Sequence, residues 1–157
     1  MPRNLGVFAI FLIFSVIALS QTKQTPYTGQ EQRAIKALSP QEIQMYLEGH
    51  GMGLAKAAEL NHYPGPRHVL DLAAELKLSH AQFTETQQIY DRMHNDAVAL
   101  GKRIIAKEKQ LDSLYVNQKI NEAQLRALVG EIARLQGELR MIHLNAHLEM
   151  KKILLPP

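Results

Sequence analysis

Histidine is the residue type whose number and spacing in this sequence point most directly to chemistry. The chain has seven histidines and no cysteine, so imidazole nitrogens, and not thiolates, are its main ligands for a transition-metal ion. His143 and His147 are four residues apart, a spacing that brings two side chains to one face of a helix. Two imidazoles in that arrangement can share a divalent ion.

A third histidine, His94, is expected beside this pair. If two long helices form an antiparallel hairpin with a turn near residues 118–120, His94 lies level with His143. Glu149 or Met150 then supplies a fourth ligand, and three imidazoles favour Zn, Ni or Cu. The alternative interpretation is that these histidines face solvent beside the helical interface and bind nothing.

A second candidate region is GHGMGLAKAAELNHYPGPRHVLDL, residues 49–72. His50 and Met52 alternate with three glycines and could bind a soft ion such as Cu(I). The simpler interpretation is structural, because glycines permit tight turns and Pro64-Gly65-Pro66 separates two short helices. On the sequence alone, we rank His50 and Met52 below the three-histidine set.

Helices are the elements that must position these residues. Ser39-Pro40-Gln41-Glu42 has the pattern of a capping box, with proline at the first helical position. Glycines and prolines then divide the chain into short segments. Short helices are therefore predicted over residues 40–48, 54–61 and 67–76.

Two much longer helices are predicted after the short ones. Ser79 and Gln82 form another capping box, and apolar residues then recur with alternating spacings of three and four. The pattern stops at residues 117–121 and resumes from Leu125 to Ala146. We therefore predict an all-α fold, in which short N-terminal helices pack on a long antiparallel helical hairpin.

The N-terminus is typical of a signal peptide. Arg3 precedes an apolar run, VFAIFLIFSVIAL, and Ala18-Leu19-Ser20 offers a cleavage site before Gln21. The prediction is a signal peptide over residues 1–20, a flexible polar leader over 21–37 and one helical domain over 38–157. The protein is then exported, to the periplasm in a Gram-negative cell, and contacts the membrane only if residues 1–20 remain as an uncleaved anchor.

Composition and motifs argue against several classes of protein. The sequence has no Gly-rich phosphate loop, no HExxH and no nucleophile elbow, so we do not expect an enzyme. The net charge is only +3, and the basic residues alternate with glutamates, which argues against nucleic-acid binding.

Both long helices carry apolar residues outside the expected interface. These could pack against the short helices or a second subunit, or they could form a surface that binds unfolded chains. The apolar positions are Val98, Ile105, Met141, Leu144 and Leu148, and the basic residues around them are Lys102, Arg103, Arg140 and Lys151.

Two stretches resemble a known family. LSHAQ, with Leu78, Ser79 and Gln82, resembles the LTxxQ motif of the Spy/CpxP family, and GMGLAKAAELNHYPGPRHVLDL resembles a segment of its periplasmic heavy-metal sensor branch. The similarity covers about residues 38–157. It implies a homodimer of helical hairpins without enzymatic activity.

The resemblance implies two kinds of function. Some relatives are ATP-independent chaperones that hold unfolded envelope proteins, and this is the first expectation for the chain. Others bind metal ions and signal to a membrane-bound partner, an anti-sigma factor or a sensor kinase, and this is the alternative.

Overall fold

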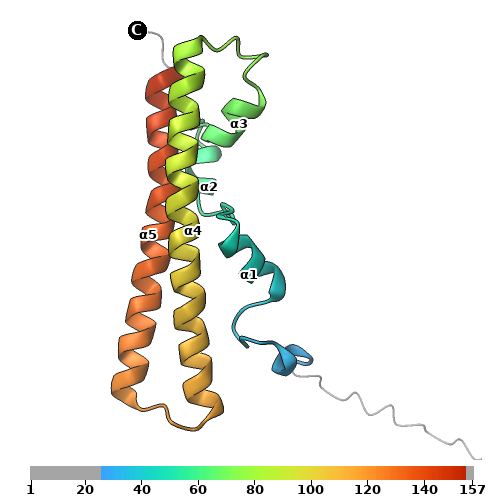
Figure 1. The fold of residues 1–157 in the computed structure, drawn as a ribbon, viewed down its shortest axis with the longest axis vertical. Helices are drawn as coiled ribbons and strands as arrows, with labels where there is room; N and C mark the ends of the chain where they lie inside the picture. Colours follow the sequence, from blue (N-terminus) through green and yellow to red (C-terminus); the bar gives the residue numbers. More distant parts are fainter. Residues whose placement is uncertain (1–25, 155–157) are drawn as a thin grey trace, which may run out of the picture.

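The computed structural model describes residues 26–154, so the predicted signal peptide and residues 21–25 lie outside the described part. It consists of helices, and no strand occurs among the described residues. Figure 1 shows two long antiparallel helices with the short ones along one side. The predicted all-α hairpin is therefore confirmed. The elements are η1 (Gln30–Gln32), α1 (Pro40–Leu47), α2 (Lys56–Glu59), α3 (Pro66–Asp71), α4 (His80–Val116) and α5 (Glu122–Leu154).

Capping explains where three of these helices begin. At α1 the Ser39 hydroxyl accepts from the Glu42 amide at 3.1 Å, and the Glu42 carboxylate accepts from the Ser39 amide at 2.7 Å. Ser79 and Gln82 make the same pair of bonds at α4, and Asn121 and Gln124 make it before α5. Each pair satisfies amides that have no partner within the helix.

The helices α2 and α3 are shorter than the sequence predicts. The chain leaves α2 through His62 and turns again at Lys77, and both residues adopt left-handed backbone conformations with φ of 64° and 52°. After His62 the Tyr63 amide donates back to the Ala58 carbonyl at 3.0 Å, which ends α2, whereas Lys77 ends the run of turns at residues 72–77 that follows α3. The short helices therefore change the direction of the chain, and the loops between them lie against the hairpin.

The core lies between α4 and α5, as the apolar pattern predicts. One cluster consists of Ala97, Leu100, Ile104, Leu135 and Leu139, and another of Val69, Ile89, Ala146 and Met150. The apolar pattern begins at Phe83 and resumes at Leu125, but the buried interface does not extend to these two residues, which are 42% and 36% exposed. Both lie in the first turn of a long helix, at opposite ends of the hairpin.

The end of the expected flexible leader is packed against the hairpin. Ile35 is buried, and the Lys36 amide donates to the Asp112 carboxylate of α4 at 3.2 Å. The Lys36 ammonium lies 3.6 Å from the same carboxylate. The packed domain therefore begins before residue 38.

Two contacts position the short helices and the hairpin ends. Helix α1 approaches α4 so closely that a Cβ at Gly101 would lie 2.2 Å from the Tyr46 carbonyl oxygen. The side chain of Gln82 caps α4 with its oxygen, and its Nε2 donates to the Ile153 carbonyl of α5 at 3.1 Å. Gln82 of the LSHAQ motif thus joins the start of one long helix to the end of the other.

No helix within residues 26–154 has the length and apolarity needed to cross a membrane.

Candidate metal-binding pocket

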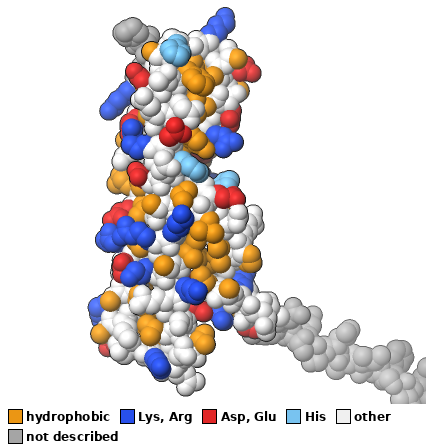
Figure 2. Space-filling model, in the orientation of Figure 1, with side chains coloured by type: hydrophobic (Ala, Val, Ile, Leu, Met, Phe, Trp, Pro, Cys, Tyr) orange, Lys and Arg blue, Asp and Glu red, His pale blue; other side chains and the backbone are white. Residues whose placement is uncertain are grey.

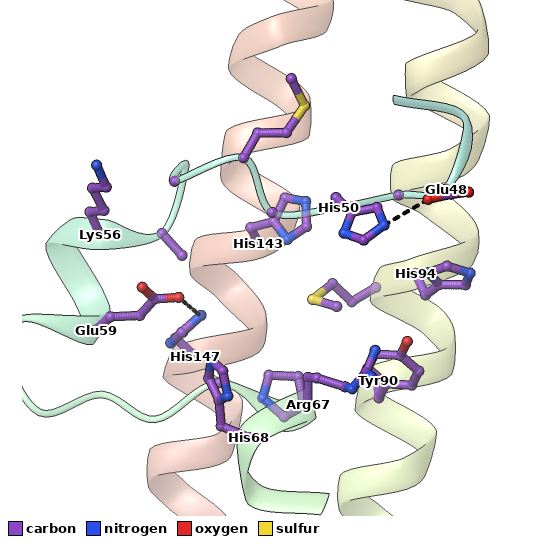
Figure 3. Close-up of a pocket in the computed structure, with 18 residues that line it drawn as sticks. Glu48, His50, Lys56, Glu59, Arg67, His68, Tyr90, His94, His143 and His147 are labelled. Atoms are coloured by element: carbon purple, nitrogen blue, oxygen red, sulfur yellow. Dashed lines mark hydrogen bonds and ion pairs between the residues drawn. The ribbon is translucent and has the colours of Figure 1, made fainter. Parts of the chain in front are cut away.

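A cavity of about 520 Å³ lies where the loop after α1, helix α2 and the start of α3 meet the hairpin. Figure 3 shows imidazoles reaching it from both long helices and from the short segments. Five of the seven histidines of the chain line it. The polar and sulfur-bearing lining residues are Glu48, His50, Met52, Lys56, Glu59, Arg67, His68, Tyr90, Met93, His94, His143 and His147.

The three histidines expected to lie together do line this one cavity, and each lies close to a glycine of the N-terminal segment. A Cβ at Gly49 would be 3.1 Å from Nδ1 of His94, and one at Gly51 would be 3.9 Å from Nδ1 of His143. At Gly65 the added atom would be 2.9 Å from Cε1 of His147. The absence of side chains at these positions lets the backbone cover the imidazoles closely.

His143 is the most unusual side chain of the pocket. It is only 4% exposed, and among the described residues nothing forms a hydrogen bond with its Nε2. Burial, together with the neighbouring His147, lowers the pKa of His143 below its ordinary value of 6.5. A neutral imidazole with a free ring nitrogen is the form of histidine that binds metal.

His147 is held in a defined orientation beside it. Its Nδ1 lies 2.7 Å from the Tyr63 carbonyl oxygen, and because a carbonyl can only accept, this nitrogen must donate. In the neutral ring the lone pair is then on Nε2, which lies 3.9 Å from the Glu59 carboxylate. Metal-binding histidines are commonly fixed by such a bond from the second nitrogen.

The remaining histidines of the pocket are less constrained. His94 stacks on Tyr90 of the same helix, with ring centroids 5.7 Å apart. The His50 side chain is 56% exposed, and its Nε2 lies 2.9 Å from the Glu48 carboxylate. His50 is thus an exposed side chain at the edge of the cavity, held there by Glu48.

Two predicted ligands are not brought to this pocket. The Glu149 carboxylate pairs with Arg92, and Met150 is fully buried in the cluster that contains Val69 and Ile89. Glu149 lies two positions after His147 and therefore points away from its face of the helix. Met150, three positions after His147, lies near the same face but one turn further along, where it packs in the core. The prediction of Glu149 or Met150 as the fourth ligand is wrong for this arrangement.

The glycine-rich stretch is both a corner and part of the pocket. His50 and Met52, ranked lower on the sequence alone, line the same cavity as the other three histidines. Glu59, His68 and Met93 also line it and were missed. Their only sequence signal was proximity to residues already under consideration.

The pocket does not hold a finished ligand set. Across residues 26–154, no three His, Cys, Asp or Glu side chains lie close enough to hold one ion as they stand. The preformed part is the His143 and His147 pair, and further donors lie around it.

The apolar residues expected to bind unfolded chains differ in how exposed they are. Met141 and Leu148 are 57% and 50% exposed. Val98 is half-buried and lies where a Gly49 Cβ would meet it at 3.0 Å, so the short segment covers it. The ammonium of Lys151 lies 3.8 Å from the Tyr63 ring centroid. Ile105 and Leu144 are half-buried, whereas Lys102, Arg103 and Arg140 are exposed.

Apolar and charged side chains are mixed on the face drawn in Figure 2. Outside the pocket, a shallow hollow of about 420 Å³ between α4 and α5 is lined by Leu100, Met141 and Ile142 together with Asp96, Ala99, Arg103 and Glu138.

Comparison with known proteins relates the chain to a family named for heavy-metal resistance. The model of the heavy-metal resistance family matches residues 7–157, nearly the whole chain. That family lies within the Spy/CpxP-like superfamily of periplasmic proteins, so the resemblance is confirmed at the superfamily level. Neither a curated protein nor a solved structure matches the chain significantly. The chain belongs to the heavy-metal resistance family.

Proposed function

We propose that this protein binds a transition-metal ion in the histidine pocket, with His143 and His147 as its first ligands. The observation that carries the proposal is the buried Nε2 of His143, which lacks a partner among the described residues and lies in a cavity lined by four other histidines. A buried polar atom without a partner costs about 1–3 kcal/mol, so its presence calls for a compensating role.

Binding would draw the short segments toward the hairpin. The preformed pair lies on α5, whereas His50 and Glu59 come from the loop after α1 and from α2. His50 is exposed and can exchange its contact with Glu48 for a metal ion. A site shared between the segment and the hairpin would make the position of residues 48–68 depend on metal.

That dependence suits a sensor. We propose that the chain, exported to the periplasm by residues 1–20, reports metal to a membrane-bound signalling partner. The heavy-metal resistance family supports this proposal over a purely structural role.

The test is isothermal titration of the protein with Zn(II), Ni(II) and Cu(II), expressed from the full chain without a histidine tag. We expect one ion per chain, and His143→Ala should lower the affinity at least about tenfold. His80→Ala is the matched control, because His80 is exposed and does not line the cavity. Equal binding by His143→Ala and the unmodified protein would exclude the proposed site.

A second function, binding of unfolded envelope proteins, is favoured by the exposure of Met141 and Leu148. Exposed apolar side chains on a helix with basic neighbours suit weak, general binding. The double variant Met141→Glu, Leu148→Glu should lose its ability to suppress aggregation of a heat-unfolded test enzyme. The Gly130→Glu variant, which changes an exposed position near the other end of α5, is the control.

The same residues could instead form a homodimer interface. Sedimentation equilibrium distinguishes the two uses. A dimer that becomes a monomer in the double variant assigns Met141 and Leu148 to self-association, whereas an unchanged assembly leaves them for clients.

A further inference from the structure

The histidine pocket also contains sulfur. Met52, from the loop after α1, and Met93, from α4, both line the cavity and are half-buried. Figure 3 draws two sulfur atoms in yellow, one among the imidazoles and one on the other side of the pocket loop. Two other methionines have different surroundings, since Met150 is fully buried in the core and Met141 is exposed outside the pocket. Thioethers from two separate elements thus line the same cavity as the imidazoles.

Met52 occupies this position against its backbone preference. Its φ is 47°, in the left-handed region, between Gly51 and Gly53. For a residue with a side chain that conformation costs about 1–2 kcal/mol, a steric penalty that glycine does not have. Strained residues of this kind concentrate at functional sites. Met52 thus keeps a thioether at a position where glycine would fit with less strain.

The charges around the cavity disfavour a site built for a hard divalent ion. Two carboxylates line it, Glu48 and Glu59, together with the basic residues Lys56 and Arg67, and Arg67 pairs with Asp71 outside the cavity. Glu48 is already paired with His50. The donors that remain are mostly neutral, and neutral sulfur and nitrogen donors suit soft monovalent ions, whereas carboxylates suit harder divalent ones.

We infer that the pocket selects a soft monovalent ion, Cu(I) or Ag(I), over Zn(II), with the thioethers of Met52 and Met93 completing the His143 and His147 pair. This inference rests on the proposed function, because it assigns the class of ion to the same pocket. It adds two ligands that set the selectivity.

The first experiment compares affinities for two kinds of ion. Cu(I) affinity is measured without oxygen, by competition with a chromogenic Cu(I) chelator, and Zn(II) affinity by competition with a zinc chelator. The double variant Met52→Leu, Met93→Leu keeps apolar side chains of similar size and removes both sulfurs. We expect it to weaken Cu(I) binding at least about tenfold and to change Zn(II) binding by less than about threefold.

The matched control is Met141→Leu, which should change neither affinity because Met141 lies outside the pocket. A second measurement needs no variant at the site. In the unmodified protein labelled at the methionine methyl groups, Ag(I) should shift the NMR signals of Met52 and Met93 and leave that of Met141 in place.

The outcomes separate the inference from the function on which it rests. If Zn(II) binds through His143 while the methionine signals stay in place and the double variant binds Cu(I) normally, the selectivity is wrong and the metal pocket stands. If neither ion binds in a manner that depends on His143, both proposals fail.

Discussion

At the scale of single residues, His143 links the stability of the fold to pH. Its pKa is lowered in the folded protein, first by burial and then by His147. As pH falls below 6.5, the unfolded chain takes up a proton at this position that the folded chain does not. The free energy of unfolding therefore decreases, and the contribution of His143 is fully present only above that pH.

The corresponding prediction concerns urea unfolding at pH 7.5 and pH 5.5. The unmodified protein should lose stability between these values, and His143→Leu should lose less, because leucine has no proton to take up. His80→Leu, at an exposed histidine, should behave as the unmodified protein does. An equal loss in His143→Leu would show that acid acts elsewhere.

Gly65 controls the orientation of His147. Its φ of −86° and ψ of 151° suit any residue, so Gly65→Ala tests the contact alone. The added Cβ would lie 2.9 Å from Cε1 of His147 and 3.1 Å from Nε2. The ring must then move from the Tyr63 carbonyl, and we expect metal affinity to fall about tenfold.

Gly130→Ala is the matched control for this substitution. Apart from the neighbouring backbone of α5, nothing in the described part of the chain lies within 4 Å of a Cβ there. It should leave metal binding unchanged and raise stability by up to about 1 kcal/mol, because alanine is a better helix former. If both variants bind metal equally well, the orientation of His147 is not important for binding.

At the scale of elements, the docking of α1 on α4 depends on Gly101. A Cβ at this position would lie 2.2 Å from a backbone carbonyl oxygen of Tyr46, which cannot rotate away as a flexible side chain can. Because α1 leads directly into the pocket loop, its displacement would also move Gly49 and His50.

We therefore predict that Gly101→Ala destabilises the protein by about 1–3 kcal/mol in urea unfolding, despite the higher helix propensity of alanine. Gly137→Ala on α5 should instead stabilise it by up to about 1 kcal/mol, since no described atom apart from the neighbouring backbone of α5 lies within 4 Å of the added group. Stabilisation by both variants would contradict the close docking of α1.

At the scale of the whole molecule, a long rigid hairpin supports short segments that cannot be stable alone. Helices α2 and α3 contain four and six residues, whereas isolated helices shorter than about 12 residues are marginal in water. Their order depends on packing against α4 and α5, which makes them the part of the fold that a ligand can stabilise most.

Hydrogen exchange measured by mass spectrometry tests this division. A metal ion bound in the pocket should slow exchange in residues 48–68 and leave residues 100–110 and 128–139 of the hairpin unchanged, because those residues are already protected by the core. The exchange of the His143→Ala variant should not respond to metal. Protection confined to α5 would mean that the short segments take no part in binding.

The sequence by itself determined the elements and much of the interface between the long helices. Capping pairs such as Ser39 with Glu42, and the apolar spacing along the long helices, depend on residues only three or four positions apart. Such local signals do not depend on how distant parts of the chain pack. They also identified His143 and His147 as neighbours on one helical face.

Only the tertiary structure decided which other residues join that pair. Met52, Met93 and Glu59 reach the cavity because the short segments approach the hairpin closely, at glycines whose partners are distant in sequence. Glu149 was a reasonable ligand by sequence distance and lies outside the pocket, paired with Arg92. Contacts between distant segments depend on the packing of whole elements, and no periodicity within one element encodes them.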